Sequence, residues 1–407
     1  MTPVVAAAEE RAEKRAIPST YGDILRAAQE LAPKLRARSA EIEQARRLPP
    51  DVVEKVRATG AFGMGFSREF GGPDLTSAEQ TRVLEALSYG DTAVGWCAMV
   101  GMDSGLYASY LQPSAVRELF PSPHMVTSGL INPAGRAERV PGGYRLTGRW
   151  AFGSGITHAD RVSAGAFTYT GGQQDVVSGG PNWRIMLVSP ADVELVDTWR
   201  TTGLAGSGSL DYTITDLFVP EEHTFTFAEI PRRTGPLAAP DAIMRKMPGV
   251  PIGTARAALD HVREIACTRT DRSTSAPWSE DYRVQTVIGR CELDYLAMRH
   301  AVYSSIDQRW THLDAGGTLD DLTPDERVSC VLLALNAFRT ALSIVRRLYD
   351  LLATTAIYRP SPIDRAMRDL TTMCQHVQAQ EVIVQSAGAH LIGGTPRFPF
   401  ALGLTGF

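Results

Sequence analysis

The chain is poor in lysine and nearly balanced in charge. Its 407 residues carry 41 lysines and arginines against 45 aspartates and glutamates, a formal net charge of −4. A slightly acidic chain without basic blocks excludes a general nucleic-acid binder and favours small-molecule ligands. The basic residues other than arginine are Lys14, Lys34, Lys55 and Lys246. The arginine excess is typical of genomic bias, but it also supplies bidentate donors for phosphate.

Cysteine pairs and long hydrophobic runs are absent. The five cysteines contain no C-x-x-C pair, so we expect reduced thiols. No stretch approaches the roughly 18 apolar residues of a membrane span, and the N-terminal apolar run is short and followed at once by charges. These absences predict a cytoplasmic protein with neither signal peptide nor membrane segment. The cysteines are Cys97, Cys267, Cys291, Cys330 and Cys374.

Motifs for several enzyme classes are also missing. The eight histidines include no H-x-x-x-H or H-E-x-x-H, so no metal site is predicted. G-x-S-x-G, a Walker loop and a strand-linked G-x-G-x-x-G are absent as well. Hydrolase and nucleoside-triphosphatase functions are therefore disfavoured.

What remains is the composition of a folded chain with a three-part pattern. Hydrophobic residues make up 44% and charged residues 21%, and 407 residues exceed one ordinary core. The pattern predicts an N-terminal extension (1–19), a helical domain (20–124), an antiparallel β-domain (125–235), a four-helix bundle (236–391) and a C-terminal tail (392–407). The fold class is α+β.

Capping residues mark several helix starts. Thr76 with Glu79 predicts a capping box, and the apolar stretch 83–111 that follows predicts one buried helix interrupted by glycines. Thr323 and Ser361, each followed by proline, predict two further starts. The four bundle helices are expected at 240–268, 280–312, 323–353 and 362–391.

The β-domain contains two segments with candidate binding residues. Around Ser154, Trp150 and Phe152 stand two apart and so share one strand face, as a wall for a planar heterocycle or as plain core. The Gly-Ser turn 206–209 suits close approach to a phosphate or ring, but an ordinary bulge has the same composition. The segment 171–182 between strands is predicted to be an exposed loop.

A polar stripe is predicted on the last bundle helix. At helical spacing, Arg365, Asp369, Thr372 and His376 lie close to one another on one face. A solvated face is one interpretation. The other is a largely buried His376 that gives or accepts a proton near neutral pH.

Taken together, these features resemble the acyl-CoA dehydrogenase superfamily across residues 20–392. The patterns W-x-F-x-S-G-x-x-H at 150–158, W-x-x-x-G-L-x-G-x-G-S at 199–209, F-V-P-E at 218–221 and S-P-x-x-R-x-x-R-D at 361–369 are similar to its two-component flavin-dependent monooxygenases. The members of this group D branch oxidise 4-hydroxyphenylacetate, dibenzothiophene, indole-3-acetate and aromatic polyketides.

The resemblance implies catalytic roles for three residues. Ser154 would stand beside the flavin and support a C4a-hydroperoxide, and His376 would face the same locus as hydrogen-bond or proton donor. Several members carry a histidine where this chain has Asp103. That aspartate is expected to be an acid or base, a partner for a substrate amine, or a structural partner of an arginine.

The resemblance also implies a cofactor site and partners. A separate NAD(P)H:flavin reductase would deliver reduced FMN or FAD. With O2, the enzyme would hydroxylate an aromatic or heteroatom-containing molecule in natural-product tailoring or aromatic catabolism. A homotetramer is expected, in which Arg269 reaches a flavin phosphate of a neighbouring subunit. The expected cofactor-binding residues are Trp150, Phe152, Ser154, Ser128, Arg269, Ser207 and Arg365.

Departures from the dehydrogenases leave three alternatives. The Y-E-G-T segment that carries their catalytic glutamate is missing, the segment 241–249 has no glutamate, and Ala353-Thr354 replaces a usual Gly-Gly pair. An acyl-CoA dehydrogenase or oxidase is thus disfavoured for want of a base. The second alternative is an N-oxidising relative that acts on an amine or amino sugar. The third is a non-catalytic flavin-fold scaffold.

Overall fold

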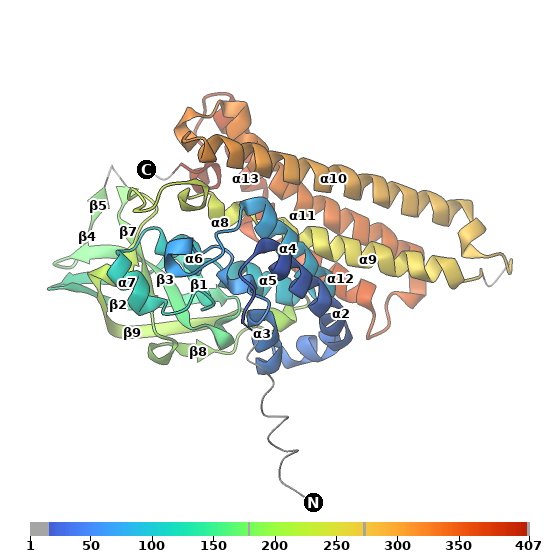
Figure 1. Ribbon diagram of the computed structural model, residues 1–407, viewed down its shortest axis with the longest axis horizontal. Coiled ribbons are helices and arrows are strands. Elements are labelled where there is room, and N and C mark those ends of the chain that lie inside the picture. Colours follow the sequence, from blue (N-terminus) through green and yellow to red (C-terminus); the bar gives the residue numbers. More distant parts are fainter. Residues whose placement is uncertain (1–15, 178–179, 272–273, 405–407) are drawn as a thin grey trace, which may run out of the picture.

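The computed structural model describes residues 16–177, 180–271 and 274–404. Helices and sheet segregate along the chain, with the sheet at one end of the molecule, the long helices at the other, and the N-terminal helices between them (Figure 1). The predicted α+β class is confirmed. Most of the predicted N-terminal extension lies outside the described residues.

The N-terminal helices include one correction. Thr76 and Glu79 form the predicted capping box. The single helix predicted over 83–111 is wrong, because the Asp91 carboxylate accepts from the Val94 N–H at 3.1 Å and begins a new helix there. The helices are α2 (Tyr21–Ala45), α3 (Pro50–Arg57), α4 (Ser77–Gly90), α5 (Thr92–Gly101), α6 (Ser104–Ala108) and α7 (Pro113–Leu119).

The main sheet is mixed rather than antiparallel. Its order is β10-β7-β3-β1-β2-β9-β8, and β1 and β3 pair in parallel. The chain reverses direction from β1 to β2 and again from β2 to β3, so β3 arrives at the free edge of β1 running the same way. The strands are β1 (Thr127–Val140), β2 (Gly143–Gly153), β3 (Arg161–Thr170), β4 (Gln173–Gln174, paired with β3), β7 (Trp183–Val188), β8 (Glu194–Val196), β9 (Leu210–Pro220) and β10 (Thr224–Phe225).

Part of the predicted loop 171–182 forms short paired strands. Strands β5 (Val176–Val177) and β6 (Gly180–Pro181) pair with each other beyond the main sheet, and the valines are exposed. The segment was expected to be exposed, and the short strands do not change that.

The C-terminal helices run beside one another, with α11 in contact with α9, α10, α12 and α13 (Figure 1). Thr323 and Ser361 accept the predicted capping hydrogen bonds. The predicted helix 362–391 is wrong, because the chain leaves the helix after Cys374. The helices are α8 (Ala242–Arg245), α9 (Gly249–Thr268), α10 (Tyr282–Asp314), α11 (Pro324–Leu352), α12 (Pro362–Met373) and α13 (Glu381–Leu391).

Helix α11 accounts for the most apolar part of the sequence. Within the described residues, the helical segment 324–355 is long and apolar enough to cross a membrane by length and composition alone. Core helices of bundles pass the same test, and Phe338, Ala341 and Ile344 of α11 are fully buried against neighbouring helices. Packing inside the bundle explains this composition.

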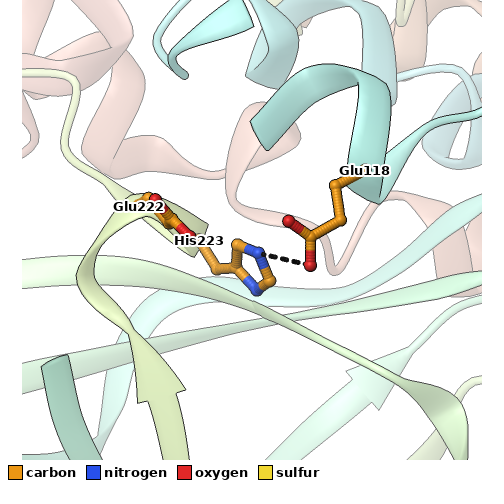
Figure 2. A group of neighbouring side chains, drawn as sticks. All are labelled: Glu118, Glu222 and His223. Atoms are coloured by element: carbon orange, nitrogen blue, oxygen red, sulfur yellow. Dashed lines mark ion pairs between the residues drawn. The ribbon is translucent and has the colours of Figure 1, made fainter. Parts of the chain in front are cut away.

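A polar contact connects α7 to the sheet. His223 of the turn η6 (Glu221–His223) lies 3.3 Å from Glu118 of α7, and Glu222 is adjacent (Figure 2). Both glutamates are exposed to solvent. Exposed acidic side chains often gather in this way, so we interpret the cluster as a contact between the helical domain and the β-domain.

Candidate active site

A cavity of about 530 Å³ lies where the helical domain, the sheet and the C-terminal helices meet. One wall is the face of α5 and α6, and a second is the start of β1 with the end of β2. The loop 199–209, the segment 243–247 and the C-terminal tail contribute the rest. Its polar lining includes Asp103, Ser128, Ser154, Ser163, Ser209, Thr372, Gln375 and His376.

Ser154 lies in this cavity at the turn that follows β2, and hydrogen bonds fix its position. Its Oγ accepts from the indole Nε1 of Trp96 at 3.0 Å and is 2.8 Å from Ser209 Oγ. Ser128, which also lines the cavity, donates from its Oγ to the Ser154 carbonyl at 2.7 Å. The hydroxyl therefore has a fixed location, and two of its hydrogen-bonding positions are already taken.

Ser207, a predicted cofactor contact, does not line the cavity. It is 1% exposed, and its Oγ donates to the Leu204 carbonyl at 2.7 Å and lies 2.7 Å from Ser209 Oγ. Ser207 thus positions Ser209 and, through it, Ser154, and its role as a cofactor contact stays a prediction. Gly208 adopts a positive φ of 55° and turns the chain between the two serines.

Trp150 and Phe152 do not share a face. Trp150 is 1% exposed, stacks on Tyr212 and donates from Nε1 to the Gly165 carbonyl, so it belongs to the core. Phe152 has a positive φ of 62° at a bulge between β2 and β9 and lines the cavity with 63% of its surface exposed. The bulge breaks the two-residue alternation on which the prediction rested.

His376 faces the cavity from the break between α12 and α13. Its Nδ1 accepts the Gln378 N–H at 3.2 Å and caps the short turn η11 (Val377–Ala379), so Nε2 carries the hydrogen of the neutral ring. Burial lowers the pKa of His376 to about 4. Although part of the ring is accessible from the cavity, it is neutral at physiological pH, and it offers a hydrogen-bond donor rather than a base.

Arg365 does not line the cavity, and its role as a cofactor contact stays a prediction. Its Nε donates to Glu43 Oε2 at 3.0 Å, and it lines a separate polar hollow of about 100 Å³ with Asp91 and Asp369. Helix α12 thus does place Arg365 and Asp369 together, but His376 lies beyond the end of that helix.

Asp369 holds the loop 199–209 against α12. Its Oδ1 accepts the Leu204 N–H at 2.7 Å, and a Cβ on Gly203 would lie 2.1 Å from the Arg368 carbonyl oxygen. Only glycine allows such a close backbone approach. Because Leu204 and Ser209 of this loop line the cavity, Asp369 controls the position of one cavity wall.

Replacing Asp369 with asparagine is expected to change how stability depends on pH. Burial, opposed by the Leu204 N–H, raises the pKa of Asp369 from 3.8 to about 7. A raised carboxyl pKa costs stability as pH rises from about 4 to 7, because the unfolded chain loses its proton first. Asparagine keeps the acceptor but cannot ionise, so between pH 4 and pH 8 the variant should gain about 4 kcal/mol relative to the parent. Chemical denaturation at both pH values measures this gain, and parallel pH curves would contradict it.

Asp103 is buried in the cavity wall and pairs with a lysine rather than an arginine. Lys246 Nζ lies 2.5 Å from Asp103 Oδ1 and 3.0 Å from the Ile243 carbonyl. The two residues are 7% and 3% exposed. Burial raises the pKa of Asp103, and the Lys246 ammonium opposes that rise. The expected arginine partner is thus corrected to Lys246.

Arg269 is remote from the cavity of its own chain. Its guanidinium stacks on Trp278 at 4.1 Å and donates to Thr355 Oγ1 at 3.2 Å, beyond the end of α9. Within one chain it does not contact a ligand in the cavity, and its predicted role depends on a neighbouring subunit.

Several residues in or next to the cavity were not identified as site residues from the sequence. Trp96 and Ser209 hold Ser154, Lys246 pairs with Asp103, and Phe398 and Phe400 bring the C-terminal tail into the wall. Two features of the sequence point weakly to these residues. Trp96 belongs to a Gly-Trp pair in the apolar stretch, and Lys246 is one of few lysines in the chain. Neither specifies a contact between segments far apart in the sequence.

Comparison with known proteins identifies two family models in the chain. Residues 22–114 match the acyl-CoA dehydrogenase N-terminal domain, and residues 248–381 match the acyl-CoA dehydrogenase C-terminal domain. Together they cover the N-terminal helices and most of the C-terminal helices, on both sides of the sheet.

Individual proteins are similar over most of their length. Indole-3-acetate monooxygenase of Pseudomonas putida is 31% identical over 366 residues, which cover 89% of this chain and 91% of that protein. The flavin-dependent monooxygenase oxygenase subunit HsaA of Rhodococcus jostii is 25% identical, over 83% of this chain and 90% of the relative. The structure of XiaF from Streptomyces sp. in complex with FADH2 and glycerol matches with a TM-score of 0.83 at 23% identity, over 97% and 99% of the two chains, and so shares the fold.

Proposed function

Because this chain belongs to the flavin-dependent monooxygenases that share the acyl-CoA dehydrogenase fold, we propose that it is the oxygenase component of a two-component system. It uses reduced flavin and O2 to hydroxylate an aromatic or heteroatom-containing small molecule. The observation that carries the proposal is the cavity in which Ser154 and a neutral His376 both face the ligand space.

The cavity residues fit a flavin ring. Phe152 and Trp199, in edge-to-face contact at 6.3 Å, present aromatic surface beside the Ser154 hydroxyl. The volume of about 530 Å³ lies in the usual range of roughly 300–1,000 Å³ for small-molecule sites. When bound, reduced flavin supplies two electrons to O2, so that one oxygen atom enters the substrate and the other leaves as water.

Two side chains then act directly on the reacting atoms. Ser154 presents its hydroxyl to the ligand space, and hydrogen bonds with Trp96 and Ser209 fix the position of that hydroxyl. His376 offers its Nε2 hydrogen to oxygen that becomes negative as the bond between the oxygen atoms breaks. The cavity lining is mostly apolar, which disfavours water at the bound ligand; water otherwise diverts the reaction to hydrogen peroxide.

The same geometry argues against an acyl-CoA dehydrogenase. Removing an α-proton requires a carboxylate in the cavity that is free to act as a base. Among the described residues lining the cavity, Asp103 is the one carboxylate, and it pairs with Lys246 about two helical turns along the wall from Trp96, the residue that holds Ser154. His376 has its available nitrogen protonated and cannot serve instead.

The proposal includes a separate NAD(P)H:flavin reductase as partner, since relatives such as HsaA are named as oxygenase subunits. NAD(P)H is a cytoplasmic reductant, so we place the pair in the cytoplasm. A homotetramer is part of the same proposal. Leu293 and Leu296 on the outer face of α10 are 66% and 57% exposed, which suits a contact between bundles. In that assembly Arg269, which stacks on Trp278 and donates to Thr355 within its own chain, would pair with a flavin phosphate of a neighbouring subunit.

Anaerobic titration with reduced FMN and reduced FAD tests this function. We expect saturable binding of at least one flavin, and a near-ultraviolet transient after mixing with O2, before oxidised flavin accumulates. Ser154→Ala should shorten the transient about tenfold, the loss of one strong hydrogen bond. Ser305→Ala, which removes a buried hydroxyl on α10, is the matched control. Failure to bind either flavin, or bleaching of bound oxidised flavin by an acyl thioester, would overturn the proposal.

A further inference from the structure

Asp103 is positioned at a definite distance from the Ser154 end of the cavity. Trp96, Met99, Asp103 and Tyr107 follow one another at helical spacing along α5 and α6, and all line the cavity. Asp103 lies two residues beyond the end of α5, in a turn that keeps right-handed helical backbone angles. Seven residues at helical rise span roughly 10 Å, so Asp103 lies about that far along the wall from Trp96, the residue that holds Ser154. A group bound at Asp103 is therefore remote from the atoms that react.

One oxygen of Asp103 remains available to a ligand. Its Oδ1 receives the Lys246 ammonium, whereas no described residue hydrogen-bonds to Oδ2. The side chain is 9% exposed and lines the cavity, so this accessible part opens to the ligand space. A buried carboxylate oxygen without a partner is costly, and a ligand hydrogen-bond donor would satisfy it.

The cavity has almost no other charge. Lys246 is 3% exposed and does not line it, and no arginine or lysine is among the described lining residues. His376 is neutral. Asp103 and Lys246 together carry no net charge, so a bound anion would meet the unpaired carboxylate oxygen without a compensating cation. A bound ammonium would add a net positive charge to largely apolar walls.

We propose that the Asp103–Lys246 pair selects a neutral aromatic substrate that carries an N–H or O–H donor, and binds that donor at Asp103 Oδ2. This inference rests on the proposed function and adds its substrate class. Asp103 is a specificity residue that anchors the end of the substrate remote from Ser154 and His376. An anion such as indole-3-acetate, which gives a similar protein its name, is disfavoured in this cavity.

Matched probes separate these possibilities in the protein saturated with reduced flavin under anaerobic conditions. We expect calorimetry to show indole binding at least about tenfold more tightly than 1-methylindole, which lacks the donor, and phenol more tightly than anisole by a similar factor. Indole-3-acetate should bind at least about tenfold more weakly than indole. The flavin titration made beforehand tests the proposed function independently.

A double variant assigns the preference to the pair. In Asp103→Leu with Lys246→Met both charges are lost together and neither remains unpaired. The indole to 1-methylindole ratio should fall close to one, while flavin affinity is retained. The inference is overturned if the methylated probe binds as well as indole, if the ratio survives in the double variant, if indole-3-acetate binds more tightly, or if neither indole nor phenol binds to flavin-saturated protein.

Discussion

His376→Ala is expected to lower hydroxylation at least about 10²-fold, the usual effect of removing one positioned hydrogen-bond donor to developing negative charge. Oxygen consumption should continue and yield hydrogen peroxide. The neutral ring presents Nε2–H to the cavity because Nδ1 is held by the Gln378 N–H. Since burial lowers the pKa of His376 to about 4, the ring stays neutral from pH 5 to pH 8 and the loss should be the same across that range. Product and peroxide yields per flavin oxidised measure it.

Two substitutions separate this role from helix capping. Asparagine at position 376 has a side-chain oxygen near the place of Nδ1 and can accept the Gln378 N–H, but it has no donor at the place of Nε2. Glutamine reaches further and has a donor there. We expect His376→Asn to remain as stable as the parent but as uncoupled as His376→Ala, and His376→Gln to recover part of the coupling. Full coupling in the asparagine variant would show that His376 matters only as a cap.

Lys246→Met is expected to cost about 3–5 kcal/mol of unfolding free energy, the usual effect of leaving one buried charge unpaired. The ammonium lies 2.5 Å from Asp103 Oδ1, and both side chains are buried, so solvent cannot replace either partner. Chemical denaturation of the flavin-free protein at pH 8 measures the loss.

Adding Asp103→Leu to Lys246→Met should restore most of that stability, because neither charge then remains. The double variant is thus the appropriate protein for the ligand comparison. A surface pair provides the control: Lys55 and Asp51 are half exposed, and Lys55→Met should change stability by less than about 1 kcal/mol. Additive losses in the Asp103–Lys246 double variant would mean that the two charges do not interact.

Local patterns were sufficient for much of the fold. Thr76, Thr323 and Ser361 cap helices as predicted, because a cap depends on residues within one turn of one another. The parallel pairing of β1 with β3 was missed, since alternation along a strand shows which residues share a face and not which strand lies beside it.

A site residue was predicted correctly only where the backbone turns the side chain named by the motif toward the cavity. Ser154, Ser128, Phe152, His376 and Asp103 all line the cavity. Trp150 lies in the core instead, because a bulge with a positive φ at Phe152 turns the two rings apart. Such a bulge arises from pairing with β9, a partner that the local sequence does not specify.

By itself the sequence determined the family, the order of helices and sheet, and the residue types available for chemistry, because these depend on motifs and periodicity. Only the tertiary structure decided what those residues can do. The end of α12 before His376 fixes which ring nitrogen carries the hydrogen. The contact of the turn between α5 and α6 with the end of α8 gives Asp103 a lysine from 143 positions away and leaves one oxygen to the cavity. Protonation and charge balance depend on burial and on partners distant in sequence, which are set when the chain folds.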